Sequence, residues 1–196
     1  MYVLRSTLQI GDRGTWIATV ILEAKLMAQR TIGTDQLIAW LDDAYAMETG
    51  LISILQNHAA HYNPVMPSAA RRIQQHIVET QQHAQRLQEC LRLMNATPSR
   101  VKSALSSLMG TVEGASTAVF RDQLVKDALA DYASEQFEIG CYTALVSIAV
   151  ELGQMQVAQL CKLNLAEDQA MATWLLEQLP HVVLYDAAGS EYRRRA

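Results

Sequence analysis

Apolar residues recur along this chain every three or four positions, which is the spacing of an amphipathic α-helix rather than of a strand. The pattern predicts four long helices, over residues 34–61, 67–94, 117–152 and 154–179. Residues that end helices follow each segment in turn, namely Asn63-Pro64, Thr97-Pro98, Gly153 and Pro180.

Two shorter helices are predicted outside these segments. One runs from Thr15 to Arg30 and ends at Gly33, and the other runs from Ser99 to Met109 between the second and third long helices. The chain is thereby divided into an N-terminal extension with one helix (1–33), a helical bundle (34–182) and a flexible tail (183–196).

The order of these elements predicts the topology. Two helical hairpins, each closed by a short turn, are joined by one long connection. Ferritin-like folds have this arrangement. We therefore predict an all-α protein that forms a ferritin-like up-down four-helix bundle, with one long crossover connection and an extra N-terminal helix.

Composition indicates in which compartment the protein resides and which partners it does not bind. The net charge of −4 gives no general attraction to nucleic acid or to an anionic membrane. The apolar segment 16–22 is too short to span a bilayer. The three cysteines are far apart and no pair has CxxC spacing, which favours a reducing compartment. We expect a cytoplasmic protein that binds neither nucleic acid nor membrane.

Each long helix carries glutamate within its apolar pattern, and these residues are Glu48, Glu79, Glu135 or Glu138, and Glu167. The two hairpins repeat each other, because Tyr-Ala-Met-Glu ends at Glu48 and Tyr-Ala-Ser-Glu ends at Glu135. The next glutamate follows 31 residues later in the first hairpin and 32 later in the second. Buried carboxylates are costly unless they are paired, protonated or bound to metal. A matched set at one level of a bundle therefore predicts a di-metal site.

Two residues compete for the position on the third long helix. The repeat favours Glu135, whereas depth in the bundle favours Glu138. Glu138 lies 15 residues before Gly153, much as Glu48 lies 16 residues before Pro64. Because Glu135 and Glu138 are three residues apart, they share a helix face and both can point inward.

The histidines depart from the usual ferritin-like pattern, in which two helices carry Glu-x-x-His. Glutamine and alanine occupy the third position after Glu79 and Glu167. His76 lies three residues before Glu79 and His83 lies four after it, so both share its face. Each is a candidate ligand or a residue that orients a carboxylate, and the alternative is a half-exposed helix histidine.

Other polar residues receive simpler interpretations. His58 and His61 are predicted to lie at the surface, and Tyr142 is interpreted as a residue that fills the core. Any one glutamate taken alone is best explained by solvent or by a neighbouring arginine or lysine. The matched set is what favours inward-pointing carboxylates.

Several separated segments resemble the YciE/YciF family of small bacterial ferritin-like proteins, and the YciE branch more closely. They are residues 40–48, 75–80, 135–142, 165–168 and 174–175. The resemblance implies a ferritin-like bundle, a homodimer and a link to bacterial stress responses, without an established enzymatic activity. Two features depart from the family, because it tends to have Glu-Glu where Glu167-Asp168 stands and residues 1–33 have no counterpart.

Two functions follow as competing hypotheses. The first is a stress protein whose carboxylate site binds two iron or manganese ions and acts on peroxide or oxygen, or sequesters iron. Its predicted metal ligands are drawn from Glu48, Glu79, Glu135, Glu138, Glu167, His76 and His83. The second is a metal-free helical scaffold or interaction protein, which the missing Glu-x-x-His motifs favour. A nucleic-acid-binding miniferritin is a weaker hypothesis because the chain is acidic.

Overall fold

The computed structural model describes residues 13–99 and 122–195. Within these ranges the chain forms helices and turns without strands, and the helices are α1 (Arg13–Tyr62), α2 (Pro67–Leu93), α4 (Gln123–Glu151) and α5 (Met155–Arg195). The predicted all-α class is confirmed. The helix predicted at 99–109 and the predicted start of the third long helix at 117 lie outside the described residues.

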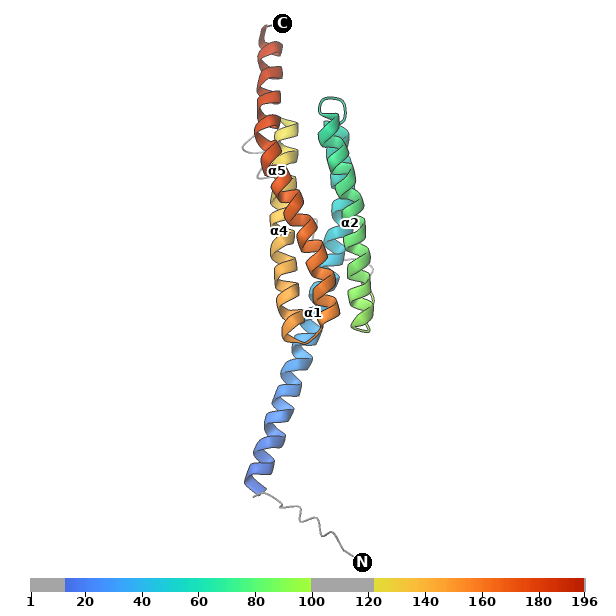
Figure 1. Cartoon of the computed structure of the whole chain (residues 1–196), viewed down its shortest axis with the longest axis vertical. Coiled ribbons are helices and arrows are strands. Elements are labelled where there is room, and N and C mark those ends of the chain that lie inside the picture. Colours follow the sequence, from blue (N-terminus) through green and yellow to red (C-terminus); the bar gives the residue numbers. More distant parts are fainter. Residues whose placement is uncertain (1–12, 100–121, 196) are drawn as a thin grey trace, which may run out of the picture.

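The helices are neighbours in a cyclic order. α1 packs against α2 and α4, and α5 packs against α4 and α2, so that α1 lies diagonally opposite α5. α2 ends and α4 begins at opposite ends of the bundle (Figure 1). This is the arrangement that one long crossover connection requires, as the sequence predicted.

Gly33 does not end a helix, because α1 continues through it from Arg13 to Tyr62. A glycine ends a helix when it takes up a left-handed conformation, as Gly153 does with a φ of 73° between α4 and α5. A β-carbon at Gly33 would lie 3.1 Å from Leu152 Cδ2. The missing side chain of Gly33 therefore permits close packing against the end of α4.

Pro180 also fails to end a helix, and the predicted flexible tail at 183–196 is helical as far as Arg195. A proline within a helix commonly bends it, and Figure 1 shows α5 changing direction along its length. Val182, two residues after the proline, is 1% exposed and belongs to the apolar core. Packing of this residue explains why the helix continues.

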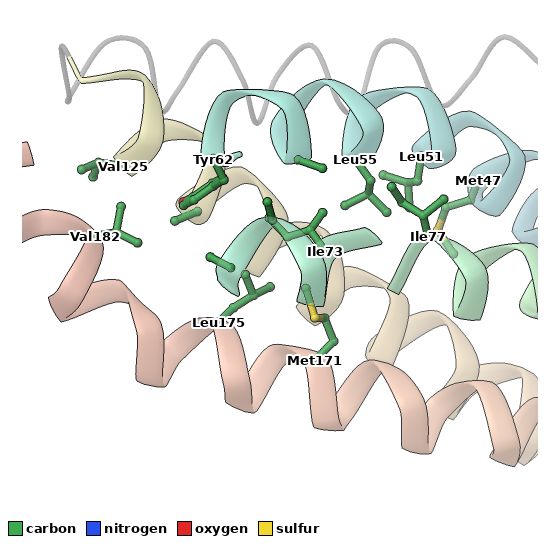
Figure 2. Close-up of a cluster of buried hydrophobic side chains, with 14 residues drawn as sticks. Met47, Leu51, Leu55, Tyr62, Ile73, Ile77, Val125, Met171, Leu175 and Val182 are labelled. Atoms are coloured by element: carbon green, nitrogen blue, oxygen red, sulfur yellow. The ribbon is translucent and has the colours of Figure 1, made fainter. Parts of the chain in front are cut away.

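The apolar core is divided into two clusters by a polar layer. One cluster lies toward the α1–α2 turn and includes Leu51, Leu55, Ile73, Met171 and Leu175 (Figure 2). The other lies toward the α4–α5 turn and includes Leu37, Leu41, Leu87, Leu91 and Leu145. Along α5, Asn164 and Asp168 are buried between Cys161 of the second cluster and Met171 of the first.

The first half of α1 projects beyond the bundle (Figure 1). Among the side chains described there, Val20, Ile21, Leu22 and Leu26 are apolar and exposed. In the part of the chain that the structure describes, no helix has the length and hydropathy needed to cross a membrane.

Candidate metal centre

Four carboxylates are buried in the polar layer. Glu48 comes from α1, Glu135 and Glu138 come from α4, and Asp168 comes from α5, and none is more than 3% exposed. α2 contributes two imidazoles, those of His76 and His83, which are also buried. All four helices therefore contribute side chains to one buried polar layer.

The carboxylates form two overlapping groups of possible ligands. One group is Glu48, His83 and Asp168, and the other is Glu135, Glu138 and Asp168. Within each group, one oxygen or nitrogen from each residue lies within 4.8 Å of the others. Asp168 belongs to both groups and therefore joins them.

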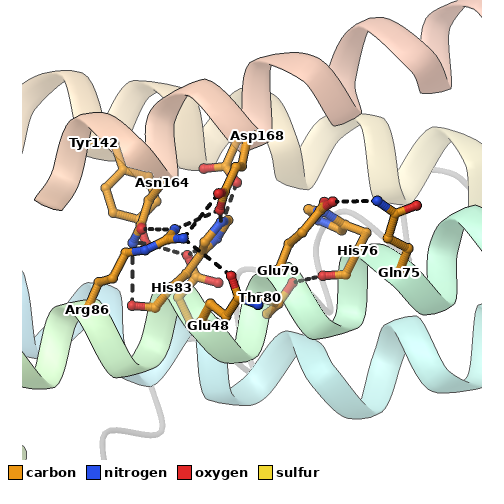
Figure 3. A network of polar contacts seen from close by, with 12 residues as sticks. Glu48, Gln75, His76, Glu79, Thr80, His83, Arg86, Tyr142, Asn164 and Asp168 are labelled. Atoms are coloured by element: carbon orange, nitrogen blue, oxygen red, sulfur yellow. Dashed lines mark hydrogen bonds and ion pairs between the residues drawn. The ribbon is translucent and has the colours of Figure 1, made fainter.

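Each histidine connects the buried carboxylates to a glutamate at the edge of the site (Figure 3). His76 lies 2.8 Å from Glu135 through Nε2 and 3.0 Å from Glu79 through Nδ1. His83 lies 2.7 Å from Glu167 through Nε2, while its Nδ1 is 3.3 Å from Glu48. Both imidazoles are thus fixed in orientation by contacts on two sides.

Arginines hold the two outer glutamates. Arg72 Nη1 donates to Glu79 at 3.1 Å, and Arg86 Nη1 donates to Glu167 at 2.7 Å. Burial alone would raise the pKa of both carboxyls, but the histidine and arginine beside each one lower it. The order arginine, glutamate, histidine, buried carboxylate occurs twice, once in each half of the site.

Tyr142 and Asn164 extend the network on one side. The Tyr142 hydroxyl donates a hydrogen bond to Glu48 Oε1, and Asn164 Nδ2 donates to the Tyr142 hydroxyl at 2.9 Å. Arg86 Nη1 donates to Asn164 Oδ1 at 2.9 Å. Burial and the charge of Glu48 raise the pKa of Tyr142, so this phenol stays protonated and acts as a donor.

Several buried polar atoms of the layer have no hydrogen-bond partner, and they are Glu48 Oε2, His83 Nδ1, Glu135 Oε2, Asp168 Oδ1 and Asp168 Oδ2. Four of these are carboxylate oxygens, which are hard ligands for divalent cations. An unpaired buried polar atom is costly. The donor set therefore fits a pair of metal ions.

Protonation is the other way to reduce the negative charge. Burial, followed by the charges of neighbouring carboxylates, raises the pKa of Glu138 and of Asp168 well above the usual range. Burial by itself lowers the pKa of His76, but the hydrogen bond and charge of Glu135 outweigh it and raise that pKa to about 10. The metal-free layer therefore holds protons that a metal would displace.

The structure sorts the residues predicted from sequence into two groups. Glu48, Glu135, Glu138, His76 and His83 meet in the buried layer, and both competing residues of α4 point inward. Glu79 and Glu167 lie at the edge, with side chains 20% and 33% exposed. In this structure both are ion-paired with arginine rather than turned inward.

Asp168 is the central residue that the sequence interpretation missed. A signal for it exists, because the buried positions of α5 follow alternating steps of four and three residues, at Val157, Cys161, Asn164, Asp168, Met171 and Leu175. Asp168 lies on this stripe and Glu167 lies one position away from it. The glutamate repeat selected Glu167, which lies at the edge of the layer, and not the buried Asp168 beside it.

The prediction that His58 lies at the surface is wrong. His58 is 5% exposed and contacts Asp131 of α4, because α4 packs over the last turns of α1. The side chain of His61 is 45% exposed and contacts Asp127. These residues form a second polar cluster, which lies nearer the α1–α2 turn than the central layer does.

Comparison with known proteins agrees with this architecture. Residues 33–188 match the family described as "Domain of unknown function (DUF892)". A protein from Xanthomonas campestris is 33% identical, with a TM-score of 0.70 over 81% of this chain and 99% of that one. The Escherichia coli stress protein YciF is 23% identical, with a TM-score of 0.65 over 76% of this chain and 95% of that one. A Desulfovibrio desulfuricans bacterioferritin described with a diiron site is 19% identical, with a TM-score of 0.65 over 83% and 89%.

The fold is therefore that of the ferritin-like proteins. Since the family match covers most of its length, this chain belongs to the DUF892 family, as the resemblance to YciE/YciF proteins predicted. The closer likeness to the YciE branch stays a prediction.

Proposed function

We propose that this chain is a ferritin-like bacterial stress protein whose central layer binds two ions of iron or manganese and serves in oxidative stress or iron handling in the cytoplasm. The observation that carries the proposal is the pair of buried ligand groups joined by Asp168, with carboxylate oxygens that lack hydrogen-bond partners. Two structural neighbours, one described as a stress protein and one as a bacterioferritin with a diiron site, support it.

The ligands would divide by group. Glu48, His83 and Asp168 would hold one ion, and Glu135, Glu138 and Asp168 would hold the other. Carboxylate and imidazole ligands suit iron and manganese in their divalent states. When bound, the metal pair would supply electron transfer to oxygen or peroxide.

The residues around the ligands would orient them and exclude water from the site. Glu167 orients His83, and such a contact behind a metal-binding histidine commonly tunes affinity. Glu79 holds His76, which in turn contacts Glu135. Tyr142 holds one oxygen of Glu48. The apolar clusters on both sides of the layer exclude water, which strengthens the attraction between carboxylates and a cation.

Metal content tests the proposal. The protein is purified without chelator, loaded anaerobically with Fe(II) or Mn(II), and assayed by elemental mass spectrometry. We expect about two ions per chain at the central layer, counted as the ions that are lost in Glu48→Gln and Asp168→Asn. Glu89→Gln is the matched control, because Glu89 is an exposed glutamate of α2 paired with Arg92.

The alternative is a metal-free scaffold or interaction protein. The ion pairs of Arg72 with Glu79 and of Arg86 with Glu167 favour it, because they occupy two glutamates that a ferritin-like site would use as ligands. No metal under any loading condition, with helicity unchanged, would decide for this alternative.

A homodimer is part of the proposal. Exposed apolar residues on the projecting half of α1 support it, since such surface is usually covered by a partner. Light scattering coupled to size-exclusion chromatography measures the mass. A mass of one chain at micromolar concentration would contradict it.

A further inference from the structure

A second polar cluster lies where the last turns of α1 meet the first turns of α4. We call His58, His61, Asp127 and Asp131 the end cluster. His58 Nδ1 lies 2.6 Å from Asp131 Oδ1, and His58 Nε2 lies 3.5 Å from Asp127 Oδ1. His61 Nδ1 lies 2.7 Å from Asp127 Oδ2. Two imidazoles and two carboxylates from separate helices thus converge.

The end cluster is rich in buried negative charge. Asp127 and Asp131 are 2% and 3% exposed, and their contacts in the described structure are the two imidazoles and the amide of Gln123. Neither carboxylate meets an arginine or lysine there. Asp131 Oδ2 is buried without a hydrogen-bond partner. Buried carboxylates in this setting are stabilised by positive charge, either from a protonated imidazole or from a bound cation.

The contacts of His58 indicate where that cation belongs. When Asp131 accepts a hydrogen from Nδ1, a neutral imidazole carries its lone pair on Nε2. In that tautomer Nε2 and the Asp127 carboxylate are two electron-pair donors 3.5 Å apart, which is the arrangement of two ligands that share one cation. Carboxylates also stand behind metal-binding histidines in this way, fixing the tautomer.

We propose that the end cluster is a second metal site, which binds one divalent transition-metal ion through His58 Nε2, His61 Nδ1 and the carboxylate of Asp127. Asp131 orients His58 and does not itself bind the ion. The ring centroids of the two histidines are 6.4 Å apart. The half-exposed side chain of His61 would move inward on binding. Because it is half-exposed, an ion can reach the cluster from solvent at this side chain.

The surroundings of the end cluster hold it in place. The Tyr62 hydroxyl donates to the backbone oxygen of Leu124 at 2.7 Å, which ties the end of α1 to the start of α4. Tyr62 packs near Val125 and Val182 in the apolar cluster of that end (Figure 2). Burial, followed by the charges of Asp131 and Asp127, raises the pKa of Tyr62, in agreement with a strongly negative site.

The end cluster is separate from the central layer. Asp131 precedes Glu135 by four residues on α4, a rise of about 6 Å along the helix. No residue belongs to both sites, so each can be removed without removing a ligand of the other.

Cobalt(II) is the probe, because its visible absorption reports ligands and geometry. The protein carries Asp168→Asn, which disables the shared residue of the central layer. We expect one equivalent of Co(II) to remain bound, with visible bands of a low-coordinate site, and isothermal titration to give the same stoichiometry. His61→Gln in this background weakens binding at least tenfold, and His58→Gln abolishes the bands.

His181→Gln is the matched control, because His181 is an exposed histidine outside the end cluster. Circular dichroism checks that every variant is folded. If the His58→Gln protein does not fold, the result for His61→Gln decides the test. Failure of the Asp168→Asn protein to bind Co(II), or binding that is unchanged in His61→Gln, would overturn the inference. Binding that depends on His61 but an empty central layer in the wild type would overturn only the proposed function.

Discussion

Asp168 and Glu167 are consecutive residues of α5 that occupy opposite sides of one histidine. Asp168 is fully buried, with Oδ1 3.4 Å from His83 Nδ1, whereas Glu167 is one-third exposed and lies 2.7 Å from His83 Nε2. A single imidazole thus separates the carboxylate common to both ligand groups from a carboxylate at the edge of the layer.

This relationship predicts different effects for two similar substitutions. Asp168→Asn should abolish metal binding at the central layer, because it removes the carboxylate common to both ligand groups. Glu167→Gln should lower affinity about 10- to 100-fold and leave the stoichiometry unchanged, as loss of a contact behind a ligand does. Competition with a chromophoric chelator measures the metal affinity and the stoichiometry of both variants. Equal losses would mean that Glu167 turns inward and binds the metal directly.

Glu138 predicts how the metal-free protein responds to pH. The unfolded chain releases this proton near the ordinary pKa, whereas burial makes the folded chain retain it to higher pH. Above the ordinary pKa, unfolding therefore releases a proton, and stability falls as pH rises until the folded pKa is reached. Glu138→Gln should stabilise the metal-free protein at pH 8 by on the order of 1–3 kcal/mol, and much less at pH 4.

The measurement is thermal melting in chelator from pH 4 to pH 9, with Glu89→Gln as the control. Glu89 is exposed and paired with Arg92, so that substitution should leave the shape of the pH profile unchanged. A Glu138→Gln protein that is less stable than wild type at pH 8 would contradict the assignment of a proton to this carboxyl.

His76 should remain protonated in the metal-free protein far above the usual range. Its pKa is raised to about 10 by Glu135, despite burial, so the stability it contributes is complete below about 6.5 and is lost as pH rises toward 10. Long-range ¹H–¹⁵N spectra in chelator should show an imidazolium at pH 8. His181, which is exposed, serves as the internal control. A neutral His76 at pH 7 would contradict the pairing with Glu135.

Val182 tests whether α5 packs beyond its proline. Val182 is 1% exposed in the apolar cluster near the α1–α2 turn, whereas Val183 is 42% exposed. Val182→Ala should cost about 1–3 kcal/mol of unfolding free energy, and Val183→Ala should change it by no more than about 0.5 kcal/mol. Urea denaturation monitored by circular dichroism compares them. Equal small effects would restore the sequence prediction of a loose tail.

The architecture could be predicted because it depends on repeated, local signals. The 3.6-residue period, the turn at Asn63-Pro64 and the left-handed Gly153 determine four helices in two hairpins. Gly33 and Pro180 misled the prediction because their effect depends on tertiary packing. Gly33 accommodates Leu152, and burial of Val182 keeps α5 helical after the proline.

The site could be predicted only in part. The repeat led to Glu48 and Glu135, which are buried in the polar layer. Spacing alone could not distinguish an inward carboxylate from one held at the edge by arginine. Arg72 and Arg86 hold Glu79 and Glu167 at the edge through contacts that depend on the packed helices. The end cluster was not predicted from the sequence, because His58 and its partner Asp131 are 73 residues apart.

The polar layer between two apolar clusters has a consequence for the life of the protein in the cell. Without a cation the two halves of the core meet across a layer in which several carboxylate oxygens lack hydrogen-bond partners, which costs stability. A ligand that binds only the folded state stabilises it by about 2.7 kcal/mol at a hundredfold excess over Kd. The fraction of folded protein and its resistance to proteolysis would then increase with the concentration of available metal. The amount of intact protein in the cell would therefore depend on how much metal is available.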